Sequence, residues 1–407
     1  MTLIQIDIPN PSQRNPSRFD VVFALGFRPL YLVSSIWAAL AVALWIFMPT
    51  ALTGKLNGVW WHAHEMLWGF IATVAVGFLL TASATWTGKN PLKSYPLAAL
   101  CTLWLLARIL YLVPGDMAFI LAALADISFF IYGAIALARV LHKVKSRQNY
   151  PLVAALLGLA AADAAYLYMV YQSHFKFLRT GFHIGMLLMT FIALLIGRRV
   201  IPFFAQRGAN LDIPRSEKSG KFQLWLSALA VISLALGNHP VTSILLFILG
   251  AITLYQLYTW KPWGVRKVPL LWVLYFSYFF LGLGLIVAAT YFFPGEAILP
   301  PATFVHLIGM GGFSVMIIGM MTRTALGHTG RPLRASRLMV FAYVFVILAT
   351  LSRLAALLLP LVITGFSITG ITVFWHISAC LWLIAFLAYA YQYAPYLTSP
   401  RADGRPG

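Results

Sequence analysis

Residues 60–66, Trp60-Trp61-His62-Ala63-His64-Glu65-Met66, place two histidines and a glutamate at the start of an apolar run that extends over residues 62–83. A run of about 20 apolar residues is long enough for a helix to cross a bilayer. Ionisable side chains are costly inside a membrane, so those found there usually pair, line a cavity or hold a ligand. The stretch therefore predicts a membrane-spanning helix with a functional site at its first turn.

The composition extends this prediction to the whole chain. Of its 407 residues, 61% are hydrophobic and only 10% are charged. Apolar runs of spanning length recur, whereas a membrane β-barrel would show short alternating segments. We expect an all-α polytopic membrane protein with about twelve transmembrane helices, at residues 29–48, 62–83, 96–113, 117–139, 151–171, 181–204, 222–236, 241–260, 269–292, 303–323, 336–359 and 370–393.

Three regions follow from these spans: an N-terminal segment (1–28), a transmembrane domain (29–393) and a C-terminal tail (394–407). The first 18 residues are polar, so no cleaved signal peptide is expected. Cys101 and Cys380 lie in apolar runs without a CxxC motif, which predicts neither a disulfide nor covalent haem attachment.

The net charge of +19 reflects topology. With these spans, 24 of the 29 Lys and Arg residues fall on one side, which the positive-inside rule assigns to the cytoplasm. Both termini are then cytoplasmic. The lipid bilayer accounts for this charge distribution, and no nucleic-acid partner is expected. The remaining five basic residues are Lys55, Arg108, Lys176, Arg179 and Arg353.

Five of the nine histidines lie near the predicted outer ends of helices, and we take them as candidate metal ligands: His62, His64, His183, His306 and His376. Side chains two apart on a helix point in different directions, so His62 and His64 are expected to serve different centres. Glu65 is expected on the face of His62, where it would orient that ring or carry protons. The alternative is an interfacial cluster beside Trp60 and Trp61. For His183 and His376, a packing role is the simpler alternative.

The segment around His306 is unusually rich in glycine. Gly309, Gly311 and Gly312 leave room for a neighbouring helix or a flat macrocycle. An internal repeat is also indicated, because His64–Gly88 and His306–Gly330 align without gaps and share five residues. A similar outline near His183 suggests three arcs of four helices.

Several charged residues inside or near the predicted spans need partners. Arg108 and Arg353 have no Asp or Glu obviously positioned beside them, so we assign them to haem propionates, with snorkelling to the surface as the alternative. His328 and Arg331 form a basic turn that would hold an anion or a propionate, or serve only as a positive-inside loop. Asp126 and Asp163 would form a proton path or pack in protonated form.

The sequence resembles the NnrS family nearly from end to end. The motifs that carry the resemblance are Gly26-Phe27-Arg28-Pro29, Trp61-His62-Ala63-His64-Glu65-Met66, Gly77-Phe78-Leu79-Leu80-Thr81-Ala82, Trp86-Thr87-Gly88, residues 197–204 (GRRVIPFF), residues 323–331 (RTALGHTGR) and Pro400-Arg401-Ala402-Asp403-Gly404. The resemblance implies a bacterial inner-membrane protein that contains haem and copper and acts in nitric oxide metabolism and nitrosative stress. His62, His64, His306 and His328 lie in matching motifs, whereas His183 and His376 do not.

A looser analogy links the predicted fold to the catalytic subunits of haem–copper oxidases. Those proteins also have twelve-helix cores in three arcs, with histidines on the second, sixth, seventh and tenth helices. This chain lacks paired histidines on the seventh helix, so a copper site of that kind is not reproduced. Fold analogy alone does not establish function.

These observations favour a haem-dependent membrane protein that binds nitric oxide and reduces it to N2O. One or two haem b groups would take axial ligands from His62, His64 and His306, and copper or a second iron would lie nearby. Quinol or an electron-donor protein would supply electrons, and Glu65 would donate protons. The competing hypotheses are a transporter or exporter of metal or iron–nitrosyl species, and a non-catalytic sensor or sink of nitric oxide.

Overall fold

The computed structural model describes residues 17–214, 217–295 and 297–405, and every regular element in these ranges is a helix. Residues 1–16 of the expected N-terminal segment lie outside the described residues. Helices dominate because hydrocarbon offers backbone groups no water to bond, and a helix satisfies them within one segment. The helices are α1 (Arg18–Val22), α2 (Phe27–Phe47), α3 (Gly58–His64), α4 (Thr73–Thr87), α5 (Ser94–Leu110), α6 (Asp116–Lys143), α7 (Tyr150–Tyr171), α8 (Phe175–Ala209), α9 (Glu217–Ala235), α10 (His239–Thr259), α11 (Pro269–Phe292), α12 (Ala302–His306), α13 (Val315–His328), α14 (Arg337–Val362) and α15 (Ile368–Leu397).

The described residues also form two π-helical segments and three short 3-10 turns. The π-helical segment η2 (Glu65–Ala72) joins α3 to α4, and η5 (Leu307–Ser314) joins α12 to α13. The 3-10 turns are η1 (Pro49–Ala51), η3 (Arg147–Asn149) and η4 (Pro262–Val265).

In the part of the chain that the structure describes, ten helical stretches are long and apolar enough to cross a membrane. They support a multi-pass membrane protein. Two other predicted spans, 96–113 and 222–236, correspond to α5 and α9. These two helices are not both long and apolar enough to count as membrane-spanning. α5 has only 17 residues, and α9 begins with charged residues at Glu217, Lys218 and Lys221.

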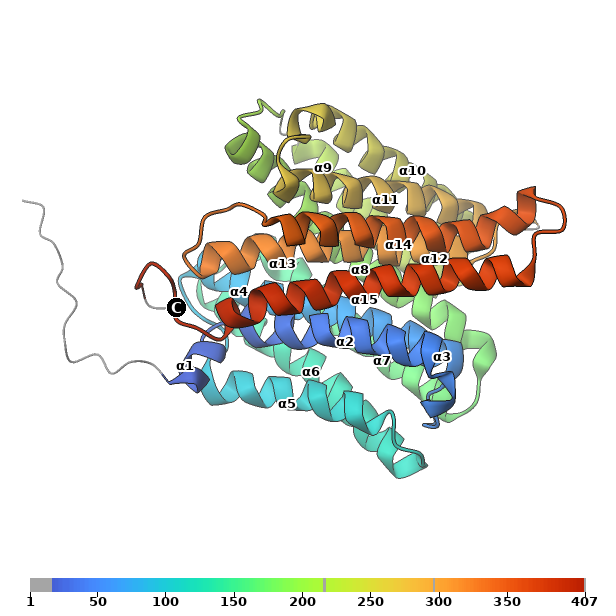
Figure 1. Ribbon diagram of the computed structural model, residues 1–407, viewed down its shortest axis with the longest axis horizontal. Helices are drawn as coiled ribbons and strands as arrows, with labels where there is room; N and C mark the ends of the chain where they lie inside the picture. Colours follow the sequence, from blue (N-terminus) through green and yellow to red (C-terminus); the bar gives the residue numbers. More distant parts are fainter. Residues whose placement is uncertain (1–16, 215–216, 296, 406–407) are drawn as a thin grey trace, which may run out of the picture.

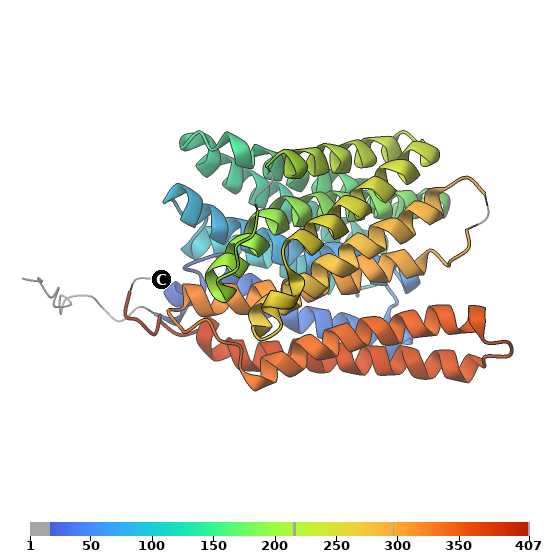
Figure 2. The same cartoon turned by 90° about the horizontal axis from the view of Figure 1, so that it is seen from above.

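The helices run along a common axis, with α1 and the C-terminal end at the same end of the bundle (Figure 1). The predicted placement of both chain ends on one side agrees with this arrangement. α14 and α15 pack together along one face of the molecule (Figure 2). In their most apolar stretches only 33% and 28% of residues are buried, against 83% for Gly58–Thr87 and 72% for Ala302–His328. The two stretches that carry His62, His64 and His306 are therefore the centre of the bundle.

These two central stretches share a local structure. Shifting η2 by the offset that aligns His64 with His306 reproduces the bounds of η5, and the two segments are in contact. Each stretch ends near a glycine with positive φ, Gly88 at 66° and Gly330 at 71°. The predicted repeat is thus present in these two stretches. It does not extend to α8, which continues as a regular α-helix through His183.

The C-terminal tail is fixed against the end of the bundle that carries α1. The guanidinium of Arg28 donates to the carbonyls of Leu397 at 3.0 Å and Ser399 at 2.9 Å. Arg401 donates to the carbonyl of His328 at 3.1 Å and pairs with Asp403. The hydrogen bond from Arg401 lowers the pKa of Asp403 to about 2, so this carboxylate is charged at neutral pH.

Candidate functional site

The side chains of His62 and His64 point into different surroundings, as their spacing predicts. His62 lines a cavity, whereas His64 is enclosed in a cluster of charged groups. Both lie at the end of α3, immediately before the π-helical segment η2. π-helical segments occur frequently at functional sites. The first turn of this stretch therefore has two candidate sites on opposite faces.

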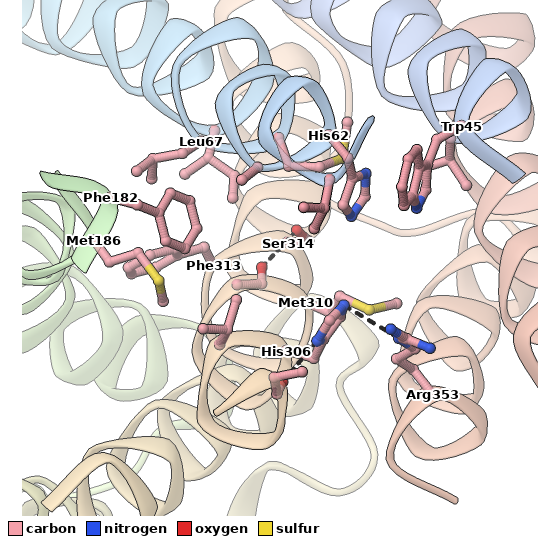
Figure 3. A pocket seen from close by; sticks show the side chains of 18 of the residues that line it. Trp45, His62, Leu67, Phe182, Met186, His306, Met310, Phe313, Ser314 and Arg353 are labelled. Carbon is pink, nitrogen blue, oxygen red and sulfur yellow. Dashed lines mark hydrogen bonds between the residues drawn. The ribbon is translucent and has the colours of Figure 1, made fainter. Parts of the chain in front are cut away.

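The cavity has a volume of about 370 Å³ and lies between the two central stretches, α2, α8, α14 and α15. Figure 3 shows the imidazoles of His62 and His306 facing the same space from opposite walls. The ring of His62 stacks on Trp45, with centroids 5.3 Å apart. Most of the remaining lining is apolar. Small-molecule sites in proteins are typically apolar with a few placed polar groups and about 300–1,000 Å³ in volume.

The two histidines offer nitrogen lone pairs to this cavity. The Nδ1 of His306 lies 2.7 Å from the carbonyl of Ala302, and because a carbonyl only accepts, Nδ1 carries the hydrogen. The lone pair is then on Nε2, which accepts a hydrogen bond from Nε of Arg353 at 3.2 Å. The Nδ1 of His62 is buried and has no hydrogen-bond partner among the described residues.

Arg353 has no carboxylate within ion-pairing distance in the described ranges, as the sequence predicts. Its guanidinium lies 4.9 Å from the ring centroid of Trp375 and extends toward His306 (Figure 3). A half-buried guanidinium without an anion can bind a carboxylate in bidentate fashion. The cavity therefore combines imidazole ligands, an unpaired cation and apolar walls.

The sequence predicts no acidic partner for Arg108, and this prediction is wrong, because two acids lie beside it. Its guanidinium donates to Oε2 of Glu65 at 2.8 Å and forms an ion pair with Asp126. All three side chains are buried. The acids could not be assigned from sequence because they come from η2 and α6, and the contact depends on how these helices pack. With its anions supplied by the protein, Arg108 has no need of a haem propionate.

Glu65 also departs from the predicted arrangement. It was expected beside His62, but its Oε1 lies 3.0 Å from Nδ1 of His64, and its Oε2 accepts from Nε1 of Trp37 at 2.8 Å. The positive charge of Arg108 attracts the carboxylate of Glu65, which explains why this side chain points toward His64. Glu65 does not line the cavity, so the prediction that it donates protons directly to a group bound there is not supported by the geometry.

The cluster around His64 is completed by two aspartates. The Nε2 of His64 lies 2.9 Å from Oδ1 of Asp163 and 3.5 Å from Oδ2 of Asp126. One ligand atom from each of these three residues lies within 4.8 Å of the others, which is close enough to share a metal ion. Both aspartates are candidates from the sequence, whereas their partner Arg108 is not assigned to them there. The available signal was the opposite charge of Arg108 at a similar depth in a neighbouring span.

The other candidate residues divide between the cavity and the ends of the bundle. His183 is buried, lines the same cavity as His62 and His306, and packs among Tyr291, Phe292 and Phe304. His376 is exposed, donates to the carbonyl of Thr372 and does not line the cavity.

His328 and Arg331 lie at the opposite end of the central stretch from His306. The guanidinium of Arg331 is 3.9 Å from the ring centroid of Tyr396, beside the docked C-terminal tail. These two residues are therefore not brought together with the cavity.

Comparison with known families identifies a match over nearly the whole chain. The family described as NnrS protein matches residues 21–401, a range that includes both the cavity and the cluster. The chain belongs to the NnrS family. Membership in this family fits a role in nitric oxide metabolism. A search of curated proteins found no match.

Proposed function

We propose that this member of the NnrS family binds haem in the cavity and uses it to bind and reduce nitric oxide. The observation that carries the proposal is the convergence of His62, His306 and the unpaired Arg353 on one apolar cavity. Imidazole nitrogens are common axial ligands of haem iron. A guanidinium without a protein carboxylate suits a propionate. The residues present therefore fit the group that the family resemblance implies.

Either His62 or His306 would hold the iron, so that a coordination position stays open for nitric oxide, and Arg353 would bind a propionate after releasing Nε2 of His306. His183 is an alternative ligand of the iron, because it lines the same cavity. When bound, haem supplies a site for nitric oxide and a one-electron carrier. Copper, which the resemblance implies, or a second iron would be an additional metal. The apolar walls would admit nitric oxide, a small molecule of low polarity, and limit the entry of water.

The proposed reaction converts two molecules of nitric oxide and one quinol into N2O, water and quinone. The two hydrogens of the quinol account for those in the water, and the same molecule supplies both electrons. An electron-donor protein that supplies two electrons, together with two protons from solution, could replace the quinol. The role would be defence against nitrosative stress or denitrification in the bacterial inner membrane. Because Glu65 lies outside the cavity, any proton from it needs an intermediate group.

Haem content of the purified protein tests this proposal. After haem-replete expression, we expect a Soret band in the wild type and a several-fold lower haem-to-protein ratio in His62→Ala and His306→Ala. His376→Ala is the matched control, because His376 is exposed and outside the cavity. Absence of a Soret band in a folded wild type would refute the haem assignment.

Turnover is tested separately from haem binding. The wild type should consume nitric oxide faster with a quinol than without it and release N2O in a one-to-two ratio to the nitric oxide consumed. Equal consumption with and without quinol would refute the reductase and favour a sink or sensor of nitric oxide. Activity in detergent, where no gradient exists, would distinguish catalysis from transport.

A further inference from the structure

A second site lies on the other face of the His64 turn. Here α3 and η2 meet α5, α6 and α7, and each of these segments contributes an ionisable side chain. The side chains of His64, Glu65, Asp126 and Asp163 are fully buried, and Arg108 is 1% exposed. We propose that this cluster binds one divalent transition-metal ion between His64, Asp126 and Asp163, separately from the cavity.

Three buried oxygens in this cluster lack a partner among the residues described. They are Oδ1 of Asp126, Oδ2 of Asp163 and the hydroxyl of Tyr111. The ring of Tyr111 is edge-on to His64, with centroids 5.0 Å apart. A buried polar atom without a hydrogen bond costs about 1–3 kcal/mol. Three such atoms around one imidazole therefore indicate a ligand, and a metal ion would use their lone pairs.

The charges of the cluster require a divalent cation or its equivalent. If all three acids are ionised, Glu65, Asp126 and Asp163 contribute three negative charges against the one positive charge of Arg108. With neutral His64 the sum is minus two, so one divalent ion makes the cluster neutral. Uncompensated charge is costly at membrane depth. Two protons would also neutralise the cluster, and the experiment below distinguishes these two cases.

The hydrogen bonds of His64 resemble those of histidines that bind metals, because one ring nitrogen faces a carboxylate. Its Nδ1 is 3.0 Å from Glu65, so the ring can donate there and turn the lone pair of Nε2 toward the two aspartates. Glu65 is fixed in turn by Arg108 and Trp37. Metal-bound histidines usually donate their second nitrogen to such a carboxylate, which sets the tautomer and the ring orientation. Arg108 also occupies Oδ2 of Asp126 and leaves Oδ1 for the ion.

The donor set selects the class of metal. One imidazole nitrogen with two carboxylate oxygens, and no sulfur, suits Zn²⁺, Mn²⁺ or Fe²⁺. The bound ion would join α3, α6 and α7 at the centre of the bundle. Its role would be to stabilise the turn that carries His62, and no electron transfer is assigned to it.

Metal analysis of the full chain, purified without chelators, tests this site. We measure Zn, Mn and Fe by mass spectrometry and subtract haem iron, which is determined from the haem spectrum. We expect about one non-haem ion per chain in the wild type and a loss of about tenfold or more in Asp163→Asn. Asp116→Asn is the matched control, because Asp116 lies at the start of α6 and pairs with Lys55 near the surface. His62→Ala should keep the ion even where haem is lost, so the two proposals fail separately.

A second measurement avoids the risk that Asp163→Asn does not fold. Wild-type protein is treated with chelator, and ZnCl2 or MnCl2 is then added while thermal unfolding is followed. An ion that binds only the folded state raises the Tm. Less than about 0.1 ion per chain, together with an unchanged Tm on addition of both metals, would overturn the proposal in favour of protons. Equal metal content in the wild type and a folded Asp163→Asn variant would overturn it as well.

Discussion

His62 and His64 are separated by one residue, yet they are surrounded by different chemistry. Among the described residues, the charged side chains that line the cavity with His62 and His306 are Arg179 and Arg353. His64 contacts three carboxylates and no apolar cavity. At the scale of a residue, the direction of the side chain therefore decides which chemistry is available. The same side-chain type is proposed to bind haem iron in one direction and a non-haem ion in the other.

Loss of Arg108 should be costly to stability, because it pairs with two buried acids. Replacing it by methionine in Arg108→Met leaves Glu65 and Asp126 buried without their cation. Breaking a buried ion pair in this way typically costs about 3–5 kcal/mol. We expect a correspondingly large loss in the free energy of unfolding, measured by denaturant titration in detergent. Arg139→Met is the control, because Arg139 is an exposed arginine on α6.

The double variant Arg108→Met/Asp126→Asn identifies the cause of this loss. Removing one unpaired acid should recover part of the stability lost in Arg108→Met, since residues in one ion-pair network couple. If the two substitutions add without coupling, or if Arg108→Met is as stable as Arg139→Met, the cluster is not held by this arginine.

At the scale of an element, the π-helical segments η2 and η5 connect the sites to the bundle. A hydroxyl in each stretch bonds a carbonyl five residues earlier, from Thr73 to Trp68 at 2.9 Å and from Ser314 to Gly309 at 2.8 Å. Such side-chain bonds satisfy backbone oxygens where the regular α-helical ladder is interrupted. The wider turn also changes which residues share a face, so helical spacing counted from the sequence is unreliable past His64 and His306.

Two glycines in η5 differ in the space that surrounds them. A Cβ added to Gly311 would lie 2.6 Å from Cγ of Phe280, whereas a Cβ at Gly309 would meet no heavy atom within 4 Å. Gly311→Ala is expected to destabilise the protein by about 1–3 kcal/mol through overpacking. Gly309→Ala should keep or slightly raise stability, because alanine favours helix. Thermal unfolding of both variants measures the difference, and equal stabilities would contradict this packing of η5 against α11.

At the scale of the whole molecule, charge and packing both place the two ends of the chain on one side. α1 and the docked tail share one end of the bundle (Figure 1). Most Lys and Arg residues belong to loops that the sequence assigns to this side. The positive-inside rule predicts that this side is cytoplasmic. With this orientation, we expect the cavity with His62 and His306 toward the outer side.

Labelling of single cysteines tests this orientation. In a background with Cys101→Ala and Cys380→Ala, His174→Cys should react with a membrane-impermeant maleimide in intact spheroplasts. Lys89→Cys should react only after the membrane is permeabilised. Both positions are exposed, so access to the reagent differs only by the side of the membrane. Labelling of Lys89→Cys in intact spheroplasts would reverse the topology.

The sequence by itself determined the class of protein, most of its helices and the depth of its histidines. Each of these properties is local to one segment: a span is defined by about 20 apolar residues, and its direction by the charges that flank it. The positions of His62, His183 and His306 near one end of their helices follow from the same counting. The divergence of His62 and His64 required only the rotation per residue of a helix.

Only the tertiary structure decided which side chains meet. In a membrane bundle the faces toward lipid and toward protein are both apolar, so the sequence does not indicate how each helix is rotated or which helix is its neighbour. For this reason the pairing of Arg108 with Glu65 and Asp126 was missed, and the contact between His306 and Arg353 could not be foreseen. These contacts between different helices separate the cavity from the charged cluster.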